Sequence, residues 1–96
     1  MRLTAKDAAT IREEVRRLDP AAEVYLFGSR TDDRARGGDI DLLVISDRLN
    51  FCDVLHLRIA ILDRIGWQQM DLLVRRRDRL TGDPLAAMAY ETGVKL

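Results

Sequence analysis

Residues 39–45 read Asp-Ile-Asp-Leu-Leu-Val-Ile, and the other predicted elements are arranged around this segment. Apart from its two aspartates the stretch is wholly aliphatic, which predicts a buried β-strand. Side chains alternate between the two faces of a strand, so Asp39 and Asp41 leave the same face with their Cα atoms about 7 Å apart. Leu43 and Ile45 continue that face, and the even-numbered aliphatic residues fill the other. Two carboxylates therefore stand at one end of an otherwise apolar strand.

The two carboxylates carry an energetic cost that a bound cation would remove. At an effective dielectric constant near 20, two negative charges about 7 Å apart repel by roughly 2 kcal/mol. A third carboxylate, Asp71, lies in residues 70–74 (Met-Asp-Leu-Leu-Val), which predict another strand. Three aspartates without a neighbouring histidine or cysteine form an oxygen-only ligand set, which suits magnesium. The simpler alternative, a strand end whose carboxylates point to water or cap helices, stays open, above all for Asp39 after Gly37 and Gly38.

A glycine-serine turn precedes the acidic strand. Residues 24–27 (Val-Tyr-Leu-Phe) predict a short buried strand that ends at Gly28 and Ser29, before the polar residues 30–38. A glycine lets the backbone approach a ligand closely, and free N–H groups at the start of a helix bind phosphate. Ser29 adds a hydroxyl donor and Arg30 a charged guanidinium fork. A Gly-Ser pair alone is more commonly a simple turn, but beside a metal site it indicates a nucleotide triphosphate site.

Three helices are predicted around these strands. Thr4 can cap a helix that runs to about Leu18, Asn50 can cap one that ends at Gly66, and the pair Asp83 and Pro84 predicts a last helix that closes near residue 93. The resulting element order predicts an α/β domain with a small mixed sheet flanked by helices in two or three layers. The order of the strands in the sheet does not follow from this pattern.

Composition limits the classes of function. The chain has 96 residues, with sixteen Lys and Arg against sixteen Asp and Glu, which predicts a single domain over residues 1–96 without a strong electrostatic field. The lone Cys52, the lack of a signal-peptide pattern and the lack of a membrane-length apolar run predict a cytoplasmic protein. Nucleic-acid binding is not expected, because the basic residues 75–79 have no interleaved aromatic side chains. Trp67 is expected to pack in the core or at its edge, with a partner interface as the alternative.

The combined motif resembles that of a known superfamily. Residues 26–30 (Leu-Phe-Gly-Ser-Arg), then eight residues, then 39–44 (Asp-Ile-Asp-Leu-Leu-Val) resemble the signature of the DNA polymerase β-like nucleotidyltransferases. The chain looks most like the minimal nucleotidyltransferase (MNT) group, which implies the nucleotidyltransferase, palm-like fold. Many relatives have serine before the first aspartate, where this chain has Gly38, so the difference affects positioning rather than a metal ligand.

The resemblance also implies a role for each motif residue. Asp39 and Asp41 would bind two Mg²⁺ ions, and Asp71 would complete the shell of the catalytic ion and help to deprotonate the attacking hydroxyl. Gly28 and Ser29 would hold the β- and γ-phosphates of ATP. Two metal ions about 3.5–4 Å apart stabilise the attacking and leaving oxygens of an in-line displacement. The implied activity is therefore nucleotidyl transfer.

The acceptor of the nucleotide is implied by the resemblance alone. Members of the MNT group are typically paired with a helical HEPN protein, and such an antitoxin can transfer AMP from ATP to a tyrosine of the HEPN toxin. Two alternatives stay open: a binding module that occludes a HEPN partner without catalysis, and the catalytic subunit of a two-part transferase that acts on a small hydroxylated molecule. The complete carboxylate set favours catalysis, since a pure binding module has no use for repelling charges. A homo-oligomer is also left open.

Overall fold

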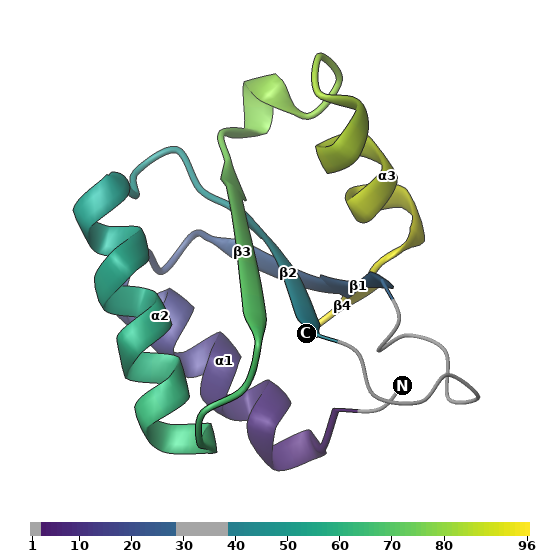
Figure 1. Ribbon diagram of the computed structural model, residues 1–96. Helices are drawn as coiled ribbons and strands as arrows, with labels where there is room; N and C mark the ends of the chain where they lie inside the picture. The colour runs from purple at the N-terminus through teal and green to yellow at the C-terminus, as the bar shows by residue number, and fades with distance from the viewer. Residues whose placement is uncertain (1–2, 29–38) are drawn as a thin grey trace.

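The fold is a small sheet with helices on both of its faces (Figure 1). A computed structural model describes residues 3–28 and 39–96. In chain order the elements of these residues are α1 (Ala5–Leu18), β1 (Glu23–Phe27), β2 (Ile40–Ile45), α2 (Phe51–Ile65), β3 (Met70–Arg75), the 3₁₀ turn η2 (Arg77–Arg79), α3 (Pro84–Thr92) and β4 (Val94–Lys95).

The sheet is mixed, as the sequence predicts. Its strand order within the described residues is β3-β2-β1-β4. β1 pairs antiparallel with both β2 and β4, whereas β2 pairs parallel with β3 through the crossover helix α2. The last strand, β4, was not predicted, because a strand of two residues is too short to show any alternation of polar and apolar side chains.

The predicted helix boundaries are confirmed by their capping contacts. The Thr4 side chain accepts a hydrogen bond from the backbone N–H of Asp7 at the start of α1. Asn50 and Asp53 form a reciprocal capping box at the start of α2. The Asp83 carboxylate accepts hydrogen bonds from two backbone N–H groups in the first turn of α3. These local contacts explain why the helices could be located from sequence.

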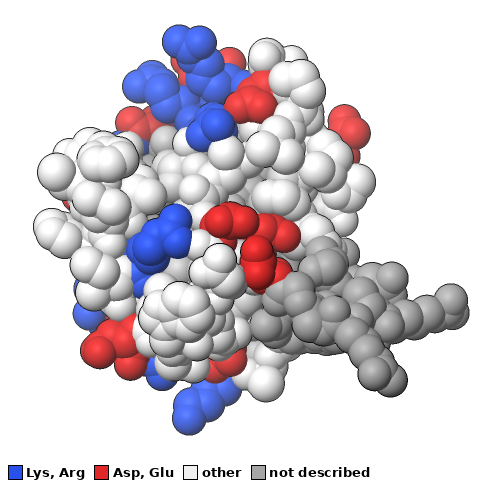
Figure 2. Space-filling view, viewed as in Figure 1, with Lys and Arg blue, Asp and Glu red and all other residues white. Residues whose placement is uncertain are grey.

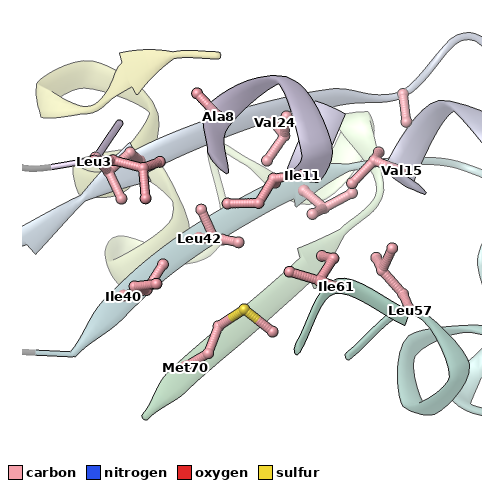
Figure 3. Packing of buried hydrophobic residues seen from close by; sticks show 13 residues of the cluster. Leu3, Ala8, Ile11, Val15, Val24, Ile40, Leu42, Leu57, Ile61 and Met70 are labelled. Atoms are coloured by element: carbon pink, nitrogen blue, oxygen red, sulfur yellow. The ribbon is translucent and has the colours of Figure 1, made fainter. Parts of the chain in front are cut away.

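One face of the sheet packs against α1 and α2. Figure 3 shows side chains of the two helices meeting the even-numbered residues of β1, β2 and β3. The residues of this larger core are buried between the two helices and the sheet. They include Ile11, Val15, Val24, Leu26, Ile40, Leu42, Val44, Leu57, Ile61 and Met70.

The other face of the sheet is covered by α3, which makes the fold three-layered. Odd-numbered residues of β1 and β2 form a second core with Ala86 and Ala89, whose small side chains let α3 approach the sheet closely. The ring of Tyr90 packs edge-on against Tyr25 in β1, with 5.1 Å between the ring centroids. Helix α3 is therefore fixed over the same sheet face that carries Asp41.

A buried polar contact joins the end of α1 to the end of β2. The Ser46 hydroxyl donates to the Asp19 carboxylate at 2.6 Å and accepts hydrogen bonds from the backbone N–H groups of Arg48 and Leu49. This hydrogen bond from Ser46 is the main cause that lowers the pKa of Asp19 below its usual value.

Replacing Ser46 with alanine is expected to lower the free energy of unfolding by about 1–3 kcal/mol, because a buried carboxylate and two partly buried backbone N–H groups lose their partner. The lowered pKa of Asp19 makes its carboxylate stabilising above pH 3.8, its unfolded value, and this contribution is lost as the pH falls through the folded-state value. The variant should therefore lose less stability than the parent on acidification. Urea unfolding at neutral and acidic pH measures both effects. Thr92→Ala, which removes an exposed hydroxyl, is the control and should change stability little.

Candidate active site

Two of the three predicted carboxylates are direct neighbours in the sheet. The parallel pairing of β2 with β3 sets Asp41 opposite Asp71. Adjacent strands lie about 4.8 Å apart, and paired residues project from the same face. The structure thus brings together two aspartates that are thirty residues apart in the sequence.

These carboxylates lie on the sheet face that α3 covers in part. Because side chains alternate, Asp41 shares this face with Leu43 and Ile45, which are buried in the second core. Asp41 itself is half-buried, and Asp71 is exposed. Asp39 lies just before β2 and is also exposed. Figure 2 shows acidic side chains gathered over the sheet near the centre of this face.

The three aspartates interact electrostatically. Burial is the main cause that raises the pKa of the Asp41 carboxyl above its usual value. The negative charge of Asp71, a hydrogen bond between these two carboxyl groups and the charge of Asp39 raise the pKa of Asp41 further. Each of these causes disfavours the ionised form of Asp41, so a cation beside it would be stabilising.

The carboxylate oxygens of these aspartates suit a hard divalent cation, although they are not arranged as a complete ligand shell. Carboxylate oxygens from β2 and β3 are the ligand type that Mg²⁺ prefers. Among residues 3–28 and 39–96, however, no three His, Cys, Asp or Glu side chains are grouped tightly enough to form a preassembled metal site. The sheet register brings Asp41 and Asp71 together, and Asp39 lies close enough to influence the pKa of Asp41.

Gly28 packs directly against the Asp41 carboxylate. β1 pairs with β2 so that Phe27 lies opposite Asp41, and Gly28 follows with a φ of 78°. A Cβ atom on Gly28 would overlap the Asp41 Oδ2 atom and lie 3.2 Å from its Cγ atom. Glycine is thus required both by the left-handed backbone and by the neighbouring carboxylate. The sequence motif predicted a close approach at Gly28 to a ligand, but the contact with Asp41 depends on a strand pairing that the sequence did not reveal.

The rest of the predicted phosphate-binding turn is not described by the structure. Ser29 and Arg30, and the polar stretch 30–38 that includes Gly38, lie outside the described residues. Their roles therefore stay predictions from the sequence.

The basic residues after β3 lie away from the carboxylates. An open cavity of about 740 Å³ is lined by side chains from residues 75–84, at the end of β3 opposite Asp71. Arg75 forms an ion pair with Asp83, Arg76 with Asp78, and Arg77 with Glu23. These ion pairs offset much of the positive charge seen over η2 at the top of Figure 2. The cavity lacks the three predicted carboxylates, so we do not assign the reaction to it.

Comparison with known protein families identifies the class of this domain. Residues 8–84 match the family model of the nucleotidyltransferase domain. The match contains both β2 and β3, and with them Asp39, Asp41 and Asp71. The chain belongs to the nucleotidyltransferase domain family, whose general activity is nucleotidyl transfer. Comparison with curated proteins gave no match. No helix in the described part of the chain has the length and apolar character that crossing a membrane requires.

Proposed function

We propose that this protein is a cytoplasmic, magnesium-dependent nucleotidyltransferase of the MNT group that transfers AMP from ATP to a hydroxyl group. One observation carries the proposal: in a nucleotidyltransferase domain, Asp41 and Asp71 are paired across two parallel strands, beside a glycine that makes room for the Asp41 carboxylate. The raised pKa of Asp41 supports a cation as the missing counter-charge.

The three carboxylates would divide the work of the reaction. Asp39 and Asp41 would hold magnesium together with Asp71, and two Mg²⁺ ions bound there would neutralise the carboxylates and polarise the α-phosphate of ATP. Asp71 is exposed, so its carboxylate can meet an incoming acceptor and take the proton of the attacking hydroxyl. The hydroxyl oxygen then bonds to the α-phosphorus, the bond from that phosphorus to the bridging oxygen breaks, and pyrophosphate leaves. Gly28, Ser29 and Arg30 would hold the leaving phosphates.

The acceptor that we propose is a tyrosine on a helical HEPN toxin, which makes the protein an antitoxin. The sequence resemblance to the MNT group supports this partner. The exposed position of Asp71 is compatible with a macromolecular acceptor, because such a hydroxyl must reach the site from outside.

Labelled ATP tests the proposal. The pure protein is incubated with Mg²⁺ and the protein encoded next to it, using ATP labelled at the α-phosphate or at the γ-phosphate in parallel. The expected result is covalent label on the neighbouring protein from α-labelled ATP alone. The double variant Asp39→Asn/Asp41→Asn should give no label.

The other outcomes identify the alternatives. A stable complex without any label would contradict catalysis and favour a binding module that occludes its partner. Label that appears on a small hydroxylated molecule would contradict the antitoxin role while retaining nucleotidyl transfer. Label from γ-labelled ATP on the neighbour would indicate phosphoryl transfer and contradict the proposed reaction.

A further inference from the structure

An exposed apolar stripe runs along the outer side of α2. Phe51 is 76% exposed, Leu55 44% and Ile59 65%, and these residues recur every four positions, so they lie along one side of the helix. Trp67, just after the helix, is also 76% exposed. The expectation that Trp67 packs in the core is therefore wrong. We call these four residues the α2 stripe.

The α2 stripe is large for a surface that stays in water. Two aromatic side chains that are three-quarters exposed offer about 300 Å² between them, and Leu55 and Ile59 bring the total to about 500 Å². Contiguous apolar patches above a few hundred Å² mark interaction sites. Figure 2 shows that the surface over the upper part of α2, at the left, is uncharged. The size of the stripe therefore indicates a docking surface.

We propose that the α2 stripe docks on the α2 stripe of a second copy of this chain, with the two helices antiparallel. The two aromatic ends of the stripe are equally spaced from Ile59 in the sequence: Phe51 lies eight residues before it, and Trp67, just past the end of α2, lies eight residues after it. A two-fold axis through Ile59 therefore sets Phe51 of each copy against Trp67 of the other. A two-fold contact of this kind uses the same patch on both chains, as most homodimers do.

The surface beside Trp67 is hollowed. A shallow hollow of about 380 Å³ lies there, lined by the apolar side chains of Ile59, Leu62 and Trp67 and bordered by Arg58 and Asp63. In the antiparallel arrangement this hollow faces Phe51 and Leu55 of the second copy. The end of the stripe that carries Phe51 therefore meets the end that carries the hollow beside Trp67.

The polar residues beside the stripe are also complementary under the same symmetry. His56 and Asp63 are both exposed and lie seven residues apart on one flank of α2. Because 56 and 63 are nearly equidistant from residue 59, the axis sets His56 of each copy near Asp63 of the other. Two imidazole-to-carboxylate contacts would then border the apolar contact and fix its register.

A second copy fits this surface better than the nucleotide acceptor does. Helix α2 covers the sheet face opposite the one that carries Asp41 and Asp71 (Figure 1). A protein docked on α2 would have to pass around the edge strand β3 to reach these carboxylates, whereas a dimer through α2 leaves both sites open. The two stripes together bury about 1,000 Å² of apolar surface, at the lower limit for a specific dimer, so we expect a dissociation constant in the micromolar range.

Sedimentation velocity and tryptophan fluorescence test the dimer. From about 1 µM to about 100 µM protein, the sedimentation coefficient should rise from monomer to dimer. The emission of Trp67, the single tryptophan of the chain, should shift to shorter wavelength over the same range. Ile59→Glu should abolish both changes, because it places two carboxylates face to face on the axis. Met88→Glu is the matched control, since it adds the same charge to an exposed apolar residue of α3 and should leave dimerisation intact.

Disulfide trapping tests the antiparallel register. In a Cys52→Ser background, Ile59→Cys should form a disulfide-linked dimer under mild oxidation, because the two new thiols meet on the axis. The natural Cys52 should not cross-link, since the two copies of Cys52 would lie about 21 Å apart along the helices. A monomer at every concentration would overturn the proposal and leave the stripe to a different protein. A dimer that survives Ile59→Glu, or one that cross-links through Cys52, would overturn this interface.

Discussion

Replacing Asp41 with asparagine is expected to reduce nucleotidyl transfer by about a thousandfold or more while making the metal-free protein more stable. Transfer falls because the neutral amide cannot replace a carboxylate ligand, and metal-ion catalysis supplies several kcal/mol of transition-state stabilisation. Stability rises because the substitution removes a half-buried charge that Asp71 and Asp39 repel. Opposite effects on activity and stability are typical of a functional site.

The gain in stability from Asp41→Asn should depend on pH, and the raised pKa of Asp41 sets the direction of this dependence. A carboxyl whose pKa is raised on folding destabilises the folded protein when it is ionised, so its unfavourable contribution grows as the pH rises from its unfolded value of 3.8 through the raised value. The stability advantage of Asp41→Asn should therefore be larger at pH 7 than at pH 4. Thermal unfolding of both proteins in the presence of a chelator measures this difference.

Two comparisons make the Asp41 result specific. Asp78→Asn changes an exposed aspartate that is paired with Arg76, and it should leave activity and stability nearly unchanged. Added Mg²⁺ should raise the melting temperature of the parent protein and not that of Asp41→Asn, because binding stabilises the folded state. An Asp41→Asn variant that retains transfer, or that is less stable than the parent at pH 7, would contradict the assignment of Asp41.

The positions of the helices could be predicted from local sequence patterns, whereas the order of the strands in the sheet could not. The caps at Thr4, Asn50 and Asp83 act on backbone groups within a few residues, so each leaves a pattern that can be recognised in the sequence. Strand order depends on contacts between distant segments, and no local pattern records that β1 pairs with both β2 and β4. The mixed character of the sheet was predicted correctly, whereas the order of its strands was left open.

For the candidate site, too, the features that depend on one segment could be predicted, and those that depend on contacts between distant segments could not. Asp39 and Asp41 were placed on one face by the alternation of a single strand, which is a local property. That Asp71 adjoins Asp41 required the parallel register of β2 with β3. The prediction for Trp67 was wrong because tryptophan is usually buried to a large extent. Whether this side chain is exposed depends on which other elements pack against it, and the local sequence does not record this.

Gly28→Ala is expected to reduce transfer by about a hundredfold and, unlike Asp41→Asn, to destabilise the protein. The φ of 78° costs a residue with a Cβ atom about 1–2 kcal/mol, and the added methyl group would also displace the Asp41 carboxylate that it overlaps. A displacement of about 1 Å at a reacting site is enough for a hundredfold loss. Steady-state transfer rates and urea unfolding measure the two effects.

A double variant separates the backbone cost from the collision. Asp41→Ala removes the Cγ and Oδ2 atoms that the new methyl group would meet, so Gly28→Ala should cost less stability in the Asp41→Ala background than in the parent. The remaining cost measures the left-handed backbone alone. Gly82→Ala is the control, because a Cβ atom there meets nothing within 4 Å, and it should affect neither activity nor stability strongly. Equal costs in both backgrounds would show that Gly28 does not act by making room for Asp41, and the packed glycine would then be a feature of the turn and not of the active site.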